Sequence, residues 1–488
     1  MPRTTAPRAP SRAPSPLPVL LAAAFVVGLD FFIVNVALPS MQADLDAGSA
    51  AVQLWVAGYG SALGALLILG SRLGDLHGRR RLFVTGLAGF TAASAVCGLA
   101  PDATTLVIAR LAQGAAAALC MPQVLAIIGT VYTEPAARGK AIAAYGLTAG
   151  LAAVSGQLIG GALIETDLAG LGWRACFLVN VPIGIAAVAV ALRTVPESRA
   201  PGTQHLDVPS VALVTGGIGA LVFGLAQGQQ RGWPLWTVLL LDAALVLLAA
   251  FALRPRRLAR AGREALIDPA LWRRPGFAAG AIATLAFQLG LASTFFVLAL
   301  ELQEGLGLTA LESGLAFTPL ALGYFASSIA SPALSRRFGT TALVGGAFTL
   351  LAGFAATAAT ATAIDPAGSV LPLLPGLTLT GVGMGLLFAP LMTFTLATVD
   401  TAQAGGASGV VSTIQQVGNA IGVTLLAIVF YGALDTGSPA DHAGAFADGL
   451  WCLAGLSLVI AVLARRLPRP AAPAHADAAD APPVAVAA

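Results

Sequence analysis

The stretch SRLGDLHGRRR, residues 71–81, decides how the rest of the chain is interpreted. It contains one acid, Asp75, a glycine suited to a tight turn, Gly78, and three consecutive arginines. Apolar runs precede and follow it, each about 20 residues long, which is the length that a helix needs to cross a bilayer. The stretch is therefore predicted to be a short basic turn between two membrane-spanning helices.

The composition of the whole chain agrees with a membrane protein. Hydrophobic residues make up 57% of the 488 residues and charged residues only 10%, whereas soluble globular proteins carry roughly a quarter charged residues. Four cysteines lie in apolar runs without the spacing of a metal or redox site, so we expect all of them to be buried: Cys97, Cys120, Cys176 and Cys452. The sequence contains no Walker phosphate loop, HExxH motif or nucleophile elbow. We therefore expect no enzyme, no metal or cofactor, and no nucleic-acid partner.

Scanning for apolar segments of sufficient length predicts fourteen spans. They lie near residues 17–38, 52–72, 82–100, 104–131, 140–164, 175–193, 207–227, 236–253, 276–302, 312–333, 340–361, 370–398, 406–432 and 447–466. An even number places both termini on the same side of the membrane. The proline-rich residues 1–16 and 468–488 are predicted to be disordered tails.

The basic residues indicate which side that is. If the N-terminus is cytoplasmic, all but three of the 26 basic residues fall in cytoplasmic loops and tails, and the opposite loops are acidic. One missed helix would reverse every later loop and destroy this pattern, so the positive-inside rule predicts that both termini are cytoplasmic. The longest basic stretch, from Arg254 to Arg274, joins the eighth and ninth spans. We interpret it as a topology signal at anionic lipid headgroups.

Residues 71–81 closely resemble the loop between the second and third helices of the major facilitator superfamily, usually written GxLaDrxGrkxxl. Ser71 replaces the leading glycine, and four positions match: Asp75, Gly78, Arg79 and Arg80. Other segments resemble family motifs in the expected order: LDFFIVNVALP (29–39), RLAQGAAAA (110–118), WRACFLVNVPIG (173–184), ELQEGLGLTALESGLAFTP (301–319) and GGASGVVSTIQQVGNAIG (405–422). The first of these is similar to a motif of the fourteen-helix drug:proton antiporters.

The resemblance implies an all-α membrane protein with the major facilitator fold. Two six-helix bundles, at 17–200 and 276–467, would enclose a substrate cavity. Two extra helices and the basic cytoplasmic loop, at 201–275, would link the bundles. The resemblance also implies a monomeric transporter that uses the proton motive force instead of a cofactor and handles small molecules.

The fifth span departs from the family pattern. The antiporter motif reads GPxxGG, and this chain has Gly156, Gln157, Gly160 and Gly161. Gly156 and Gly160 share a helix face suited to close packing. Gln157 replaces the proline that would kink the helix. A proton symporter or a dedicated metabolite exporter of the same fold therefore stays an alternative to a drug antiporter.

Ionisable groups within a bilayer are costly, so those in the predicted spans are candidates for proton coupling: Asp30, Arg110 and Glu301. Asp30 and Arg110 lie at similar depths by helix rise, and the resemblance places their helices in one bundle. Changing water access would let Asp30 gain and lose a proton beside a permanently charged arginine. The alternative is a static ion pair. Glu301 is either an interfacial glutamate that reaches water, a site for a substrate cation or a second proton site.

Asp75 has a separate role in the family. There its carboxylate, with Gly78, Arg79 and Arg80, forms a cytoplasmic gate by meeting the N-terminus of the helix that corresponds to the thirteenth span. The alternative is a salt bridge to Arg79 or Arg80 that only orders the loop.

Seven side chains are predicted to line the cavity: Asn35, Gln113, Gln288, Phe295, Gln415, Gln416 and Asn419. Neutral polar groups among apolar walls suit an amphipathic or hydrophobic compound. The leading hypothesis is proton-coupled efflux of hydrophobic or cationic small molecules, such as drugs or antibiotics. A non-transporting membrane sensor is the alternative from another class.

Overall fold

The computed structural model describes residues 15–199, 207–260, 269–364, 369–399, 404–434 and 439–467. Every regular element in these ranges is helical. The elements are α1 (Leu17–Asp44), α2 (Ser49–His77), α3 (Arg79–Gly98), α4 (Ala103–Val131), α5 (Pro135–Glu165), η1 (Leu168–Gly170), η2 (Gly172–Arg174), α6 (Ala175–Leu178), α7 (Asn180–Thr194), α8 (Val208–Gln230), α9 (Leu235–Arg260), η3 (Pro269–Arg273), α10 (Pro275–Leu300), η4 (Glu301–Gly305), α11 (Ala310–Ala316), α12 (Thr318–Phe338), α13 (Thr340–Ala361), η5 (Leu371–Leu373), α14 (Leu374–Leu396), α15 (Ala404–Gly432) and α16 (Pro439–Ala464). Residues 1–14 and 468–488 of the predicted tails, and the centre of the predicted basic loop, lie outside the described residues.

The prediction of fourteen spans is confirmed. Within the described ranges, fourteen helical segments are long and apolar enough to cross a membrane. Some spans combine several elements: the sixth joins η2, α6 and α7, and the ninth joins α10 to the single π-helical turn η4. The chain is a multi-pass membrane protein.

The predicted turn at Gly78 connects α2 directly to α3. Gly78 has a φ of +113° and is both the residue that follows α2 and the residue that precedes α3. Residues with side chains rarely adopt such a φ, so glycine lets one span end and the next begin without a loop. At the other end of α3 the chain turns back into α4, where Asp102 accepts a hydrogen bond from the Thr105 amide at 2.8 Å. That bond holds the pKa of Asp102 below its ordinary value.

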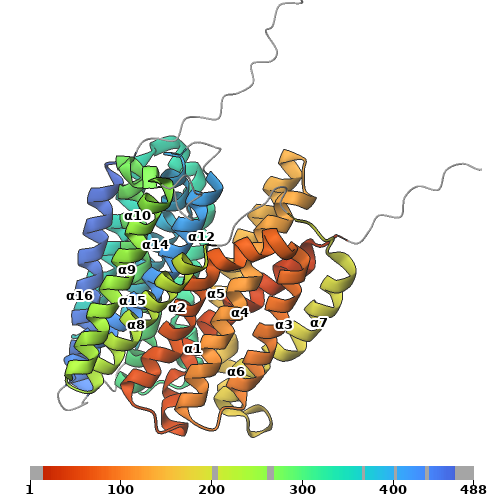
Figure 1. The fold of residues 1–488 in the computed structure, drawn as a ribbon. Coiled ribbons are helices and arrows are strands. Elements are labelled where there is room, and N and C mark those ends of the chain that lie inside the picture. The colour runs from red at the N-terminus through yellow and green to blue at the C-terminus, as the bar shows by residue number, and fades with distance from the viewer. Residues whose placement is uncertain are drawn as a thin grey trace, which may run out of the picture.

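We name the two ends of the molecule by their charges. The basic end carries the cluster Arg79–Arg81, and the acidic end carries Asp44, Asp102 and Asp167. Because the spans alternate in direction, the N-terminus of the first span and the C-terminus of the last span both lie at the basic end (Figure 1).

The helices form two bundles. In the first bundle, α1–α7, the main contacts are of α4 with α2 and α3, of α1 with α5, and of α3 with α7. In the second bundle, α10–α16, α14 packs on α12 and α13, α16 packs on α13, and α10 packs on α15. The pair α8 and α9 stands outside both, and α8 contacts α2 of the first bundle and α15 of the second (Figure 1).

The outward faces of the spans are apolar. Leu245 and Val246 of α9, for example, are 61% and 67% exposed. The expectation that all four cysteines are buried is wrong for Cys452, which is exposed on α16 beside the exposed Trp451. An apolar run buries only one side of a helix against its neighbours, and in a membrane protein the other side faces lipid.

Candidate functional site

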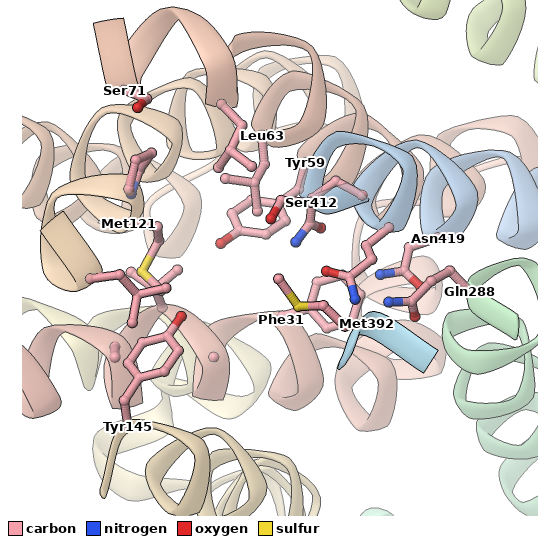
Figure 2. A pocket seen from close by; sticks show the side chains of 18 of the residues that line it. Phe31, Tyr59, Leu63, Ser71, Met121, Tyr145, Gln288, Met392, Ser412 and Asn419 are labelled. Carbon is pink, nitrogen blue, oxygen red and sulfur yellow. The ribbon is translucent and has the colours of Figure 1, made fainter. Parts of the chain in front are cut away.

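A cavity of about 640 Å³ lies between the two bundles, a size typical of small-molecule sites. The first bundle contributes residues of α1, α2, α4 and α5 to its wall, and the second contributes residues of α10, α14 and α15. Figure 2 shows Met121 and Tyr145 of the first bundle on one side of this space and Gln288 and Asn419 of the second on the other.

The wall is apolar and aromatic with neutral polar groups between. Its aromatic members are Phe31, Phe32, Tyr59, Tyr145 and Phe388. Four of the side chains predicted to line the cavity do so: Gln288, Gln415, Gln416 and Asn419. Among the described residues, the charged side chains of the wall are Arg72 and Asp75. Both belong to the last part of α2, so the cavity reaches the basic end.

Asn35, Gln113 and Phe295 do not line the cavity in this conformation. Asn35 donates to two carbonyls of its own helix, each at 3.2 Å. Gln113 is buried beside Arg110, and Phe295 stacks on Phe317 with ring centroids 5.6 Å apart. Their assignment to the wall is corrected here, because the polarity or size of a side chain in a span does not indicate which neighbour it will meet.

Asp30 and Arg110 form a buried ion pair inside the first bundle. Arg110 Nη1 lies 2.6 Å from Asp30 Oδ2, and the two side chains are 1% and 0% exposed. Gln113 bridges them, since its Oε1 accepts from Arg110 Nη1 at 2.7 Å and its Nε2 donates to Asp30 Oδ1 at 2.8 Å. Arg110 Nε also donates to the Trp55 carbonyl at 2.8 Å, and Asn180 Nδ2 donates to Asp30 Oδ1 at 2.9 Å.

These contacts identify the charge state that the site accommodates. Asp30 accepts hydrogen bonds from Arg110, Gln113 and Asn180, which is the pattern of an ionised, acceptor-only carboxylate. A buried ion pair is tolerated only when such additional hydrogen bonds satisfy its remaining atoms. The site therefore holds a hydrogen-bond network around one negative and one positive charge.

Tyr59 connects this network to the cavity. The Arg110 guanidinium lies 4.2 Å from the centroid of the Tyr59 ring, an arrangement that attracts a cation to the ring face. The same ring lines the cavity. Tyr59 therefore contacts both the ion pair and the space that a bound compound would occupy.

At the basic end, Asp75 accepts hydrogen bonds from Arg79 Nη2 at 2.9 Å and Arg79 Nε at 3.2 Å. This is the loop-ordering salt bridge that the sequence left open as an alternative. The contact of Asp75 with the start of α15 stays a prediction.

Sequence reasoning missed Glu197, which follows α7. Its carboxylate accepts from the amides of Arg80 at 3.1 Å and Arg81 at 3.3 Å. Those amides belong to the first turn of α3, where backbone donors lack helical partners and the helix dipole favours an anion. The Arg79 amide also donates to the Ser198 carbonyl at 2.9 Å. The segment after α7 therefore anchors the Gly78 turn.

The two bundles meet closely at the acidic end. A Cβ added at Gly161 of α5 would lie 2.6 Å from the Ala310 carbonyl oxygen of α11, and one at Gly314 would lie 2.6 Å from the Gln157 carbonyl oxygen. Only glycines permit this approach of α5 to α11. We call this contact the glycine gate.

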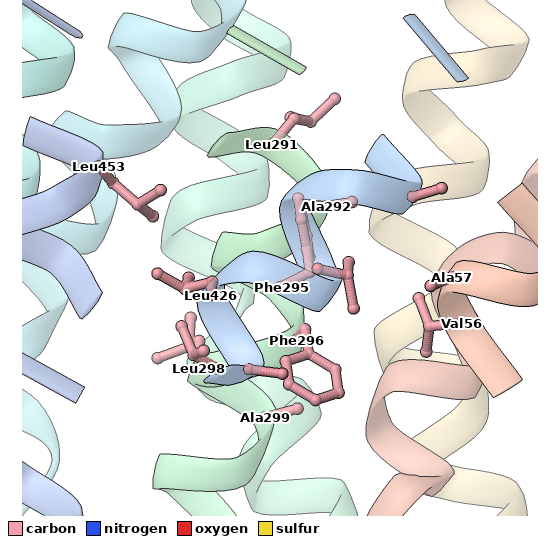
Figure 3. Packing of buried hydrophobic residues seen from close by; sticks show 14 of the residues in the cluster. Val56, Ala57, Leu291, Ala292, Phe295, Phe296, Leu298, Ala299, Leu426 and Leu453 are labelled. Carbon is pink, nitrogen blue, oxygen red and sulfur yellow. The ribbon is translucent and has the colours of Figure 1, made fainter. Parts of the chain in front are cut away.

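Other contacts extend the closure. The rings of Phe32 and Phe295 lie 5.1 Å apart, and Gln303 Nε2 donates to the Val36 carbonyl at 3.0 Å. Figure 3 shows part of the surrounding apolar cluster, which includes Phe295 and Phe296 of α10 and Val56 of α2. The molecule is closed at the acidic end while its cavity reaches the basic end.

The remaining residues of the fifth-span motif pack within the first bundle. A Cβ at Gly156 would lie 2.8 Å from Phe32 Cβ, and one at Gly160 would lie 2.8 Å from Ile33 Cγ1. Gln157 is buried and donates from Nε2 to the Phe32 carbonyl at 3.3 Å. With glutamine in place of proline, α5 runs as one helix from Pro135 to Glu165.

Glu301 is 1% exposed at the start of η4. The alternative in which it reaches water at the interface is therefore wrong for this conformation.

Comparison with known proteins places the chain in a family. Residues 20–423 match the sequence profile of the Major Facilitator Superfamily. The chain belongs to this superfamily. This major facilitator protein is 39% identical over 428 residues to a probable actinorhodin transporter of Streptomyces coelicolor, in an alignment that covers 87% of this chain and 74% of the relative. It is 39% identical to the puromycin resistance protein pur8 of Streptomyces alboniger, covering 86% and 82%. It is 35% identical to the cephamycin export protein CmcT of Amycolatopsis lactamdurans, covering 94% and 93%.

Solved structures support the same fold. A POT family transporter in complex with 5-aminolevulinic acid superposes with a TM-score of 0.67 at 15% identity, over 92% of this chain and 96% of that one. At this identity the likeness concerns the fold alone. The superfamily and the named relatives make this major facilitator protein a transporter of small molecules.

Proposed function

We propose that this protein exports hydrophobic or cationic small molecules of antibiotic type from the cytoplasm in exchange for protons. The relatives named above are described as a probable actinorhodin transporter, a puromycin resistance protein and a cephamycin export protein. A cavity of aromatic rings and neutral amides suits such compounds, because apolar walls bind their carbon skeletons and a few polar groups orient them.

The basic end is the cytoplasmic end in this proposal. The positive-inside rule supports this orientation and places both termini in the cytoplasm. The cavity that reaches the basic end then accepts compounds from the cytoplasm, and the closed glycine gate prevents their escape to the outside. Rocking of the bundles would open the acidic end and close the basic end, where Asp75 would meet α15.

One observation carries the coupling mechanism: the Tyr59 ring contacts the Arg110 guanidinium of the buried ion pair and Tyr59 also lines the cavity. A proton that binds Asp30 removes its charge, weakens its bond to Arg110 and frees the guanidinium to move against Tyr59. A bound cationic or aromatic compound would press on the same ring from the other side. Proton and compound would therefore compete, which is the requirement for antiport.

The proton motive force is the energy source in this proposal, and no cofactor takes part. Because both bundles of one chain build the cavity, a monomer embedded in membrane lipids is the proposed working unit.

The test uses purified protein in lipid vesicles with an internal pH dye. Adding puromycin on the basic-end side should drive protons across the membrane in the opposite direction. Asp30→Asn should lower this proton movement but retain exchange of labelled for unlabelled puromycin. The control is Asp46→Asn, the same change at an exposed residue whose φ of 45° asparagine tolerates. Full proton movement in Asp30→Asn contradicts the coupling role.

The same assay decides the direction of coupling. Because Gln157 replaces the proline of the antiporter motif, symport is the alternative to be tested. In symport, puromycin and protons would move in the same direction. Equal proton traces with and without compound, together with no exchange of labelled compound, across a set of cationic and neutral aromatic compounds, would indicate a membrane protein that does not transport them.

A further inference from the structure

A second group of buried ionisable side chains lies at the acidic end of the second bundle, away from the cavity. Its centre is Glu301, whose side chain is 1% exposed and whose Oε2 has no hydrogen-bond partner among the described residues. None of the ion pairs formed within the described ranges includes Glu301. Asp30, by contrast, has a cation and two amide donors.

His442 of α16 is the neighbour of this carboxyl group. A Cβ placed at Gly305 would lie 2.7 Å from Glu301 Oε2 and 3.1 Å from His442 Cβ, so both side chains pack around the same glycine. His442 is 7% exposed, and its Nδ1 has no partner among the described residues. Glycine at 305 leaves the space that the carboxyl group occupies.

The other titratable groups on the surrounding elements supply no cation. They are Glu304 on η4, Glu312 on α11, Tyr431 on α15, and Asp441 and Asp448 on α16. Glu312 caps α11 with Thr309, and Asp441 lies within electrostatic reach of His442. The two arginines of the acidic end are engaged elsewhere, Arg174 with Asp44 and Arg231 over the Trp236 ring.

A carboxylate buried without a cation or hydrogen-bond donors is strongly disfavoured, whereas the neutral acid is tolerated. We propose that Glu301 is a proton-binding site of the closed acidic end, with His442 as the group that exchanges the proton. In that exchange the Oε2–H bond breaks and the proton passes to a water molecule. Glu301 Oε2 and His442 Nδ1 do not hydrogen-bond to each other in this conformation, so the proton reaches His442 Nδ1 through such a water.

The site is connected to the closure of the molecule. Gln303, two residues after Glu301 in the same π turn, donates to the Val36 carbonyl of the first bundle. Opening the acidic end must break that bond and move η4, which admits water to Glu301. Proton exchange at Glu301 would therefore occur when the acidic end is open and stop when it is closed.

The direction and use of this proton rest on the proposed function, but its presence on Glu301 does not. Infrared spectra of the purified full chain test its presence, because a protonated carboxyl group has a carbonyl stretch that a carboxylate lacks. At pH 7 we expect this band in the wild type and in Glu304→Gln, an exposed residue of the same turn, and its loss in Glu301→Gln. Identical spectra for wild type and Glu301→Gln would overturn the proposal.

Exchange into heavy water tests the link to the gate. The band should shift slowly in the wild type and several-fold faster in Gly161→Ala, which loosens the acidic-end closure. His442→Phe should keep the band and slow its shift. A shift whose rate is the same in all three proteins would overturn the exchange role.

A transport measurement separates this proposal from the function. Glu301→Gln should lower the number of protons moved per puromycin by one, while Glu304→Gln leaves it unchanged. If the wild type moves no protons but the Glu301 band is present, the proton site stands and the proposed antiport fails. If antiport is observed with the same proton number in Glu301→Gln, the inference fails and the function stands.

Discussion

Replacing Gly161 by alanine should open the acidic end. The added methyl group would lie 2.6 Å from the Ala310 carbonyl oxygen and 2.8 Å from Leu311 Cα, which is closer than van der Waals contact permits. These are backbone atoms, so relief requires α5 and α11 to separate. Overpacking of this kind costs about 1–3 kcal/mol.

That cost applies to the closed conformation alone, because the two helices no longer touch once the gate opens. The equilibrium should therefore shift toward the open acidic end by about 5-fold to 150-fold. If about one wild-type molecule in a hundred is open, the open fraction would rise to between about 5% and 60%. The gain in helix propensity from glycine to alanine, about 1 kcal/mol, is the same in both conformations and cancels.

The shift can be measured with spin labels at Thr166→Cys and Glu312→Cys, two exposed positions on either side of the gate, in a Cys452→Ser background. Gly161→Ala should increase the population with a long distance between the labels. The control is Gly146→Ala, on the same helix with nothing within 4 Å of the added atom. Equal distance distributions in the two variants would refute the reasoning.

Three further predictions concern residues that support the fold. Asn180→Ala removes one of the donors to Asp30 and should destabilise the protein by about 1–3 kcal/mol; an unchanged melting temperature in detergent would argue against this. Glu197→Ala exposes the first turn of α3, so its amides should exchange with solvent deuterium about 2- to 30-fold faster, and equal exchange would show that Glu197 is not a cap. Burial raises the pKa of Asp207, but hydrogen bonds, first those from Arg254, outweigh it and hold the pKa below its ordinary value. The pair therefore stabilises the fold above the usual aspartate pKa of about 3.9 and loses this effect as pH falls through the lower folded value. Asp207→Asn should have a lower melting temperature than the wild type at pH 7, and this difference should disappear in strong acid. A difference in melting temperature that is independent of pH would contradict the prediction.

The fold was predictable because a bilayer imposes strong demands on sequence. Each span needs a long apolar run, and a turn such as that at Gly78 needs a residue free to adopt positive φ. These requirements are local and visible one segment at a time. The break of the sixth span into η2, α6 and α7, and the π turn at Glu301, depend on packing between distant segments and had no such signal.

The site residues that could be predicted from the sequence are those whose burial in a membrane span is unusual. Asp30 and Arg110 attract notice because charges in a span need partners, and they are each other's partner. Asn35 failed as a cavity residue because amides also satisfy themselves on their own helix. Trp55 could not be found, since it contributes a backbone carbonyl that any residue would provide. Asn180 had a signal, since it lies in the motif-like stretch 173–184, but its partner was not apparent from sequence.

The position of α8 has a consequence for how compounds arrive from lipid. It covers the line along which α2 and α15 meet, and Gln229 near its acidic end accepts a hydrogen bond from Gln53 of α2 at 3.1 Å. On the opposite flank α5 contacts α12 directly, with Gly150 facing Phe325, and within the described ranges neither α8 nor α9 shields that seam. A hydrophobic molecule diffusing in the bilayer would find one flank covered by α8 and the other flank uncovered. The pair α8 and α9 would thus make the transporter asymmetric within the plane of the membrane as well as across the membrane.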